Sequence, residues 1–147
     1  MPIIKEMRGN ILGSNCQTLV VGVNTYGVMG KGMALEFKDY FPDLFNDYRM
    51  ACTRETFATK GIFVHTHSPI KKVLCFPSKR DWRYPSKIEY IEEALQAIAR
   101  DYKLYDITSL AIPAVGCGLG KLKWNDVYQL IVKYLHPLPI DVVVYIP

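Results

Sequence analysis

Three glycines within six residues, Gly27, Gly30 and Gly32, form the clearest candidate for a ligand-binding loop. They lie between residues 18–23, an apolar run that predicts a buried strand, and residues 33–38, which predict a helix. Glycine backbone can approach a ligand closely, and the free N–H groups at the start of a helix favour an anion. The loop therefore predicts either a phosphate-binding site or, as the alternative, a tight strand-to-helix turn without a ligand.

Asn24 favours the binding alternative. The glycine spacing alone does not, because it is not GxGxxG, and Lys31 is followed by Gly32 where a P-loop has Ser or Thr. Asn24 stands where the predicted strand ends, and ligands of α/β sheets bind at the carboxyl ends of strands. Its side-chain amide can hydrogen-bond a sugar hydroxyl or hold a water.

A second glycine loop, residues 116–120, also follows a predicted strand and precedes a predicted helix. Two such loops at strand ends can hold a diphosphate and an attached ribose between them, which a single turn cannot do. Position 117 in this loop is a cysteine and position 119 a leucine. We therefore expect both loops to contact one ligand.

Predicted strands alternate with predicted helices along the chain. Ser86 and Glu89 have the spacing of a capping box, and an apolar stripe that includes Ile91, Leu95 and Ile98 predicts a helix after it. This alternation predicts an α/β fold, a three-layer α/β/α sandwich with a mixed, mainly parallel central sheet. The predicted strands are residues 3–5, 18–23, 61–65, 73–76, 110–112 and 141–146, and the predicted helices include 33–40, one that opens at 42–43, and 124–135.

Composition fits a single globular domain over residues 1–147. Half of the residues are hydrophobic and 22% are charged, with a formal net charge of +4, which modestly favours a polyanionic partner. No apolar run reaches the ~18 residues that a membrane span needs, and the first six residues do not resemble a signal peptide. We expect a cytoplasmic monomer without a membrane partner.

Neither the cysteines nor the histidines have metal-ligand spacing. His65 and His67 alternate along a predicted strand, where solvated strand-end side chains are expected. Four cysteines are scattered and predicted to be reduced, buried thiols: Cys16, Cys52, Cys75 and Cys117. The sequence thus predicts no metal and no cofactor.

The chain resembles the macrodomain family in four ordered blocks, residues 9–12, 23–38, 76–83 and 113–120. Within that family it is most similar to the DarG antitoxin macrodomain and to the terminal ADP-ribose protein glycohydrolase. The resemblance implies an ADP-ribosyl glycohydrolase that binds ADP-ribose and cleaves it from a modified macromolecule. For the DarG-like domains that substrate is ADP-ribose attached to thymine in single-stranded DNA.

The resemblance also implies a set of ligand-binding residues. In many macrodomains the position of Asn10 holds an aspartate that binds the adenine amino group; Asn10 keeps an acceptor oxygen but no charge, and its alternative role is that of a simple turn residue. The residues implied to bind ADP-ribose are Gly9, Asn10 and Ile11, then Asn24, Thr25, Gly27, Val28, Met29, Gly30, Lys31 and Gly32, then Pro113, Val115, Gly116, Cys117, Gly118, Leu119 and Gly120.

Lys79 matches the catalytic lysine of the DarG-like domains by its spacing from Phe76 and Pro77. Cleavage of a glycosidic bond to ribose passes through an oxocarbenium-like transition state, which needs a nucleophile or an activated water. A lysine with a lowered pKa can be that nucleophile, while a protonated one can stabilise a leaving group or phosphate. The alternative is that Lys79 is a solvated surface lysine without a catalytic role. Asn24 is then expected to orient the distal ribose, or a water, beside Lys79.

One position departs from the terminal glycohydrolase. There, an aspartate in the second glycine loop assists turnover of a lysine adduct, whereas this chain has Gly120. The DarG-like domains also have glycine at that position, which favours this subgroup. No carboxylate is then available at that place to activate water.

Basic and aromatic residues alternate just after Lys79. Cations can neutralise phosphates and a free aromatic face can stack a base, so this segment predicts a contact with single-stranded DNA. Trp82 and Tyr84 have the alternative of packing beneath the following helix. The predicted nucleic-acid contacts are Arg80, Trp82, Arg83 and Lys87.

Two other functions stay open at this point. One is a different hydrolase reaction, either deacetylation of O-acetyl-ADP-ribose or removal of the phosphate from ADP-ribose 1″-phosphate. The other is a reader that binds ADP-ribose without cleaving it. Activity on a modified substrate, and its dependence on Lys79, would separate the three.

Overall fold

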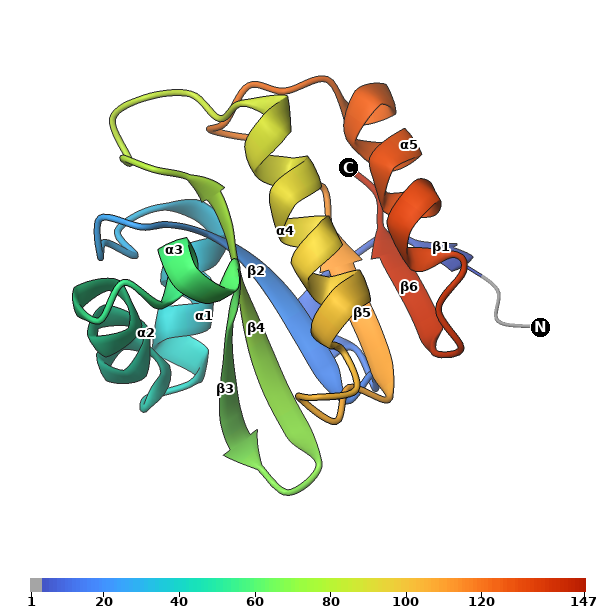
Figure 1. Cartoon of the computed structure of the whole chain (residues 1–147), viewed down its shortest axis with the longest axis horizontal. Coiled ribbons are helices and arrows are strands. Elements are labelled where there is room, and N and C mark those ends of the chain that lie inside the picture. The colour runs from blue at the N-terminus through green and yellow to red at the C-terminus, as the bar shows by residue number, and fades with distance from the viewer. Residues whose placement is uncertain (1–3) are drawn as a thin grey trace.

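One mixed sheet of six strands organises the computed structural model, which describes residues 4–147 (Figure 1). The strand order is β1-β6-β5-β2-β4-β3, and every neighbouring pair is parallel except β3 and β4. Ile3, at the start of the first predicted strand, lies outside the described residues. The strands are β1 (Ile4–Met7), β2 (Thr18–Asn24), β3 (Phe63–Ser68), β4 (Lys71–Lys79), β5 (Ser109–Pro113) and β6 (Asp141–Tyr145).

Helices cover both faces of this sheet. Helices α4 and α5 pack on the face toward the viewer in Figure 1, and α1, α2 and α3 belong to the opposite side. The predicted three-layer α/β/α sandwich with a mainly parallel sheet is therefore confirmed. The helices are α1 (Gly32–Tyr40), α2 (Leu44–Thr53), α3 (Thr56–Lys60), α4 (Ile88–Asp101) and α5 (Trp124–Leu135), with a short 3-10 turn at Ile11–Gly13.

Strand β2 shows why the sheet is buried on both sides. Successive side chains of a strand point to opposite faces. Leu19 and Val21 accordingly pack with the α1–α2 side, whereas Val20 packs with α4 and α5. All three are fully buried. A strand covered on both faces reads as a continuous apolar run, which is why residues 18–23 were recognisable from sequence.

The start of α4 differs from the prediction. The helix begins at Ile88, and the residue before it, Lys87, is extended and makes no side-chain capping bond. The capping-box prediction is wrong because Ser86 is used elsewhere: its hydroxyl donates to the carbonyl oxygen of Ser78, and its N–H donates to Gly120 at 3.0 Å. Ser86 thus ties the end of β4 to the second glycine loop.

Two further expectations need correction on the α1–α2 side. Helix α3 was not predicted; it ends at Lys60, Gly61 caps it with a φ of +84°, and β3 begins at Phe63, two residues later than predicted. His65 is not solvated: it is 4% exposed, and its Nδ1 lies 2.6 Å from Asp47 Oδ2 of α2. Within residues 4–147, no cluster of three or more His, Cys, Asp or Glu residues could hold a metal.

The cysteines follow the prediction only in part. All four are free thiols, and Cys16 and Cys75 are buried, while Cys52 and Cys117 are half-buried. Across the described part of the chain, no helix has the length and apolar character required to cross a membrane.

Candidate functional site

A cleft of about 1040 Å³ opens at the carboxyl ends of the parallel strands. Asn24 ends β2 and Lys79 ends β4, while Pro113 and Tyr145 end β5 and β6, and all four residues line the cleft. In a parallel sheet these strand ends meet at one edge, which is where α/β proteins bind ligands. The sheet order therefore brings the two glycine loops and Lys79 to one place.

Most of the predicted ligand-binding residues line this cleft, and four do not. Met29, although part of the first loop, is buried in the core, and Asn10, Thr25 and Gly27 lie outside the cleft wall. The predicted residues that line it are Gly9, Ile11, Asn24, Val28, Gly30, Lys31, Gly32, Pro113, Val115, Gly116, Cys117, Gly118, Leu119 and Gly120, together with Lys79 and Trp82.

Asn24 shapes the first glycine loop with its own side chain. Its Nδ2 donates to the carbonyl oxygen of Val28 at 2.7 Å, and its Oδ1 accepts from the N–H groups of Gly27 and Val28 at 3.0 and 3.2 Å. The Tyr48 hydroxyl donates to the main-chain oxygen of Asn24 at 2.6 Å and lies 2.9 Å from Oδ1. Asn24 therefore lines the cleft and also fixes the path of the loop.

The second glycine loop is held by close backbone packing. Gly116 has a φ of +78°, and a Cβ there would lie 2.9 Å from a methyl carbon of Leu122. A Cβ on Gly120 would collide with the Gly116 carbonyl group, 2.8 Å from its carbon. Because no side chain fits at position 120 in this backbone, the carboxylate that the terminal glycohydrolase carries there has no place here.

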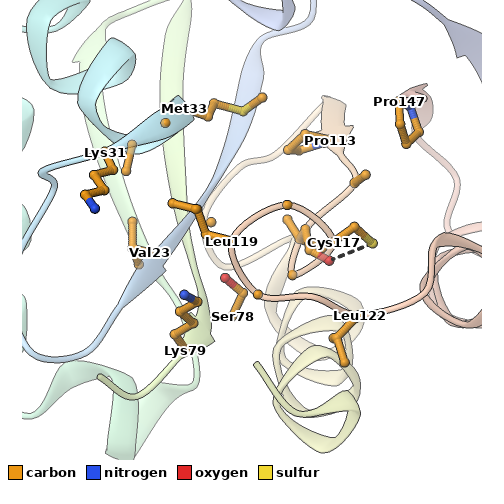
Figure 2. Close-up of a pocket in the computed structure, with 18 of the residues that line it drawn as sticks. Val23, Lys31, Met33, Ser78, Lys79, Pro113, Cys117, Leu119, Leu122 and Pro147 are labelled. Carbon is orange, nitrogen blue, oxygen red and sulfur yellow. Dashed lines mark hydrogen bonds between the residues drawn. The ribbon is translucent and has the colours of Figure 1, made fainter. Parts of the chain in front are cut away.

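Lys79 stands between the two loops. The pairing of β2 with β4 shifts by one residue, from Val23 opposite Pro77 to Asn24 opposite Lys79, and such a bulge redirects the side chains after it. Figure 2 shows Lys79 and Leu119 directed into the space between the loops. A methyl carbon of Leu119 comes within 3.9 Å of where a Cβ on Gly32 would be, so this side chain reaches across to the first loop.

The pKa of Lys79 is lowered from its ordinary value, first because partial burial disfavours the charged amine and second because Lys121 is also positive. Among residues 4–147, its Nζ makes one long hydrogen bond, to the carbonyl oxygen of Trp82 at 3.5 Å. No Asp or Glu side chain lines the described cleft. Both causes make the Lys79 amine easier to deprotonate than an ordinary lysine.

The matches to known proteins agree with this geometry. The sequence matches the Macro domain family over residues 20–131. The chain belongs to the macrodomain family. Two curated relatives, each named "DNA ADP-ribosyl glycohydrolase", come from Thermus aquaticus and Mycobacterium tuberculosis and are 40% and 39% identical over 99% and 95% of this chain. The chain spans 41% of the length of each of these relatives.

Solved structures place this macrodomain beside the DarG subgroup, as its motifs predict. The "Macrodomain of Mycobacterium tuberculosis DarG" superposes with a TM-score of 0.94 at 38% identity and covers 100% of this chain and 99% of its own. The "Macrodomain of Thermus aquaticus DarG" gives 0.93 at 39%, with both chains fully covered. "Thermosipho africanus DarTG in complex with ADP-ribose" gives 0.89 at 39%, over 95% of this chain and 40% of that one.

Part of the cleft wall near the two ends of the described chain was not predicted. Arg8, which follows β1, donates to the main-chain oxygen of Pro147 at 2.5 Å, and both line the cleft. No motif marks these residues, and only the pairing of β1 with β6 could have pointed to them. The unpredicted lining residues are Arg8, Gly22, Val23, Met33, Ala34, Ser78, Ala114, Leu122, Trp124, Tyr145, Ile146 and Pro147.

Asn10 and Thr25 have structural roles near the cleft. The Oδ1 of Asn10 accepts from the Leu12 N–H at 3.0 Å and caps the 3-10 turn, which favours the turn alternative over adenine recognition by this side chain. Thr25 donates from its N–H to Lys79 O and from its hydroxyl to Arg80 O, both at 3.2 Å. Thr25 therefore ties the first glycine loop to the segment that carries Lys79.

The predicted nucleic-acid segment is a surface loop between β4 and α4. Trp82 and Tyr84 are 47% and 62% exposed, so they do not pack beneath the helix. Arg80 lies 3.3 Å from Glu93 and 4.6 Å from the centre of the Tyr90 ring. Its neighbours Arg83 and Lys87 are also exposed. Of the four predicted residues, Trp82 alone reaches the cleft wall described above.

Proposed function

We propose that this macrodomain binds ADP-ribose in the cleft and hydrolyses it from thymine in single-stranded DNA. The observation that carries the proposal is Lys79, an amine with a lowered pKa between two glycine loops at the carboxyl edge of the sheet. Two curated relatives are named "DNA ADP-ribosyl glycohydrolase", and the related Thermosipho africanus DarTG structure is a complex with ADP-ribose, which supports the proposal.

The shape of the cleft suggests how ADP-ribose would lie. Backbone N–H groups of the two glycine loops suit a diphosphate, because they present partial positive charge without a side chain in the way. Ile11, Pro113 and Tyr145 offer an apolar wall for the adenine. The distal ribose would then lie near Asn24 and Lys79, with its anomeric carbon directed to the mouth of the cleft.

Lys79 acts as the nucleophile in this mechanism. The neutral amine attacks the anomeric carbon of the distal ribose as the bond to the thymine nitrogen breaks. The lysine nitrogen loses one proton and the departing base gains one, so the charges balance. Water then hydrolyses the lysine adduct, which releases ADP-ribose and restores the amine. Gly120 leaves no carboxylate to speed this second step, so we expect slow resolution of the adduct.

The loop between β4 and α4 supports a DNA substrate. Exposed Trp82 and Tyr84 can stack on unpaired bases, and Arg80, Arg83 and Lys87 can contact phosphates. Trp82 lies where the cleft meets this loop, so a base attached to the distal ribose would leave the cleft beside it. DNA inside the cell as substrate also fits the predicted cytoplasmic location.

The test is release of ADP-ribose from single-stranded DNA modified on thymine, followed by mass spectrometry. We expect release by the parent protein and none by Lys79→Ala, while both bind free ADP-ribose in calorimetry. Lys5→Ala, an exposed lysine on the edge strand β1, is the matched control and should behave as the parent. An active Lys79→Ala protein would refute the mechanism. Binding without release by either protein would make the domain a reader.

A further inference from the structure

A second hollow, of about 360 Å³, lies against the outer side of the first glycine loop. We call it the outer hollow. Val28 and Gly30 line both it and the main cleft, so one thin loop separates the two spaces. Nothing in the mechanism above uses it. Its lining residues are Tyr26, Gly27, Val28, Met29 and Gly30 of the loop, Lys38 of α1, and Phe45 and Arg49 of α2.

The outer hollow carries two cations on one aromatic ring. Lys38 Nζ lies 4.3 Å and Arg49 Cζ 5.7 Å from the centre of the Phe45 ring. No carboxylate lines the hollow, and within residues 4–147 neither cation takes part in an ion pair. Cations held together by a ring and left without a counter-charge attract an anionic ligand.

A surface leads from the mouth of the main cleft to this hollow. Tyr26, which lines the hollow, is 63% exposed, and the Arg83 guanidinium lies 5.9 Å from the centre of its ring. Arg83 belongs to the loop that follows Lys79, and its guanidinium is paired with Asp81 at 2.7 Å. Arg83 therefore contacts the exposed Tyr26 ring from the loop beside the cleft, and Lys38 and Arg49 supply the unpaired positive charge.

We propose that the outer hollow binds the phosphate backbone of single-stranded DNA on one side of the modified nucleotide, with Tyr26 stacking on a neighbouring base. The proposal rests on the proposed function, which places the modified base at the mouth of the cleft beside Trp82. Exposed aromatic faces alternating with cations are typical of surfaces that hold single strands, because stacking needs unpaired bases. Arg80 and Lys87 both lie near the Tyr90 ring, and we assign them to the DNA backbone on the other side of the modified nucleotide.

The experiment measures binding of an unmodified single-stranded oligonucleotide by fluorescence anisotropy over a range of salt concentrations. We expect Lys38→Ala/Arg49→Ala to weaken binding about tenfold and to reduce the slope of log K against log salt by about 1.4, since each lost phosphate contact on a single strand contributes about 0.7. Tyr26→Ala should weaken binding about fivefold with little change in slope. Calorimetry should show unchanged affinity for free ADP-ribose in all three proteins, which establishes that the variants are folded.

Lys5→Ala/Lys103→Ala is the charge-matched control, because both lysines are exposed and lie outside the two lined spaces. A Lys38→Ala/Arg49→Ala protein with the affinity and slope of this control would overturn the inference, as would a parent protein without affinity for the oligonucleotide. Because the oligonucleotide is unmodified, this experiment tests DNA binding by the outer hollow independently of the proposed hydrolysis. Loss of DNA binding in the variant, in a protein that releases no ADP-ribose, would support the outer hollow and refute the hydrolase.

Discussion

The two glycine loops of the cleft are held in shape by different means. The first, after β2, depends on polar side chains: Asn24 bonds the loop backbone and Tyr48 bonds Asn24. The second, after β5, depends on the absence of side chains, since Gly116 and Gly120 pack directly against neighbouring atoms. The first loop should therefore be sensitive to lost hydrogen bonds, and the second to added carbon atoms.

The largest effect is expected for Gly120→Ala. The new Cβ would meet the Gly116 carbonyl group, so the second loop must move and the bond from Ser86 N–H to Gly120 is lost. We expect about 2 kcal/mol of lost stability in urea unfolding and loss of measurable ADP-ribose binding in calorimetry. Gly118→Ala is the matched control, because a Cβ there meets nothing within 4 Å. Equal affinities for the two variants would contradict the steric account.

Asn24→Ala should have the second largest effect on stability and ADP-ribose binding. It removes the side-chain bonds to Val28 and Gly27, so the first loop loses its fixed path while the second stays intact. We expect about 2 kcal/mol of lost stability, with ADP-ribose affinity reduced more than tenfold by calorimetry. An Asn24→Ala protein that bound ADP-ribose like the parent would show that the loop is held by other contacts.

Tyr48→Phe should have a smaller effect of the same kind. Burial raises the pKa of the Tyr48 hydroxyl, so it stays protonated and donates to Asn24 at any ordinary pH. Its loss should cost about 1 kcal/mol and weaken ADP-ribose binding severalfold. In a double-mutant cycle, Tyr48→Phe should add little to Asn24→Ala, because both act through the same loop. If the two losses of stability added in full, Tyr48 would not act through the first glycine loop.

The pH dependence of the single-turnover rate should show the smallest change. A neutral Lys79 is the reactive form, so the rate should rise with pH and level off below the ordinary lysine range, because burial and Lys121 lower the pKa of Lys79. Lys121→Gln removes the second cause, so the pKa rises and the inflection moves to higher pH. An inflection that did not move would exclude an electrostatic role for Lys121.

Much of the fold follows from local sequence. Helix α5 matches the predicted residues 124–135, since its apolar side is regular and prolines follow it. Helix α3 escaped prediction because five residues carry too little pattern. His65 and Ser86 were misjudged for another reason: their partners, Asp47 and Ser78, lie elsewhere in the sequence and meet them only in the fold.

The site was predictable where it follows motifs and hidden where it follows topology. The glycine loops and the segment around Lys79 have recognisable residue types at fixed spacing. Arg8 and Pro147 have none, and they reach the cleft because β1 and β6 are neighbours at one end of the sheet. The outer hollow was also hidden, because Lys38 and Arg49 come from two helices and meet over Phe45.

The most direct test of the account replaces Lys79 by arginine. Arginine keeps the positive charge but is not deprotonated in proteins, so it cannot attack the anomeric carbon. We predict that Lys79→Arg binds ADP-ribose and releases none from thymine-modified single-stranded DNA in a single-turnover assay read by mass spectrometry. Release by Lys79→Arg at a rate near that of the parent would contradict a nucleophilic lysine and assign Lys79 an electrostatic role.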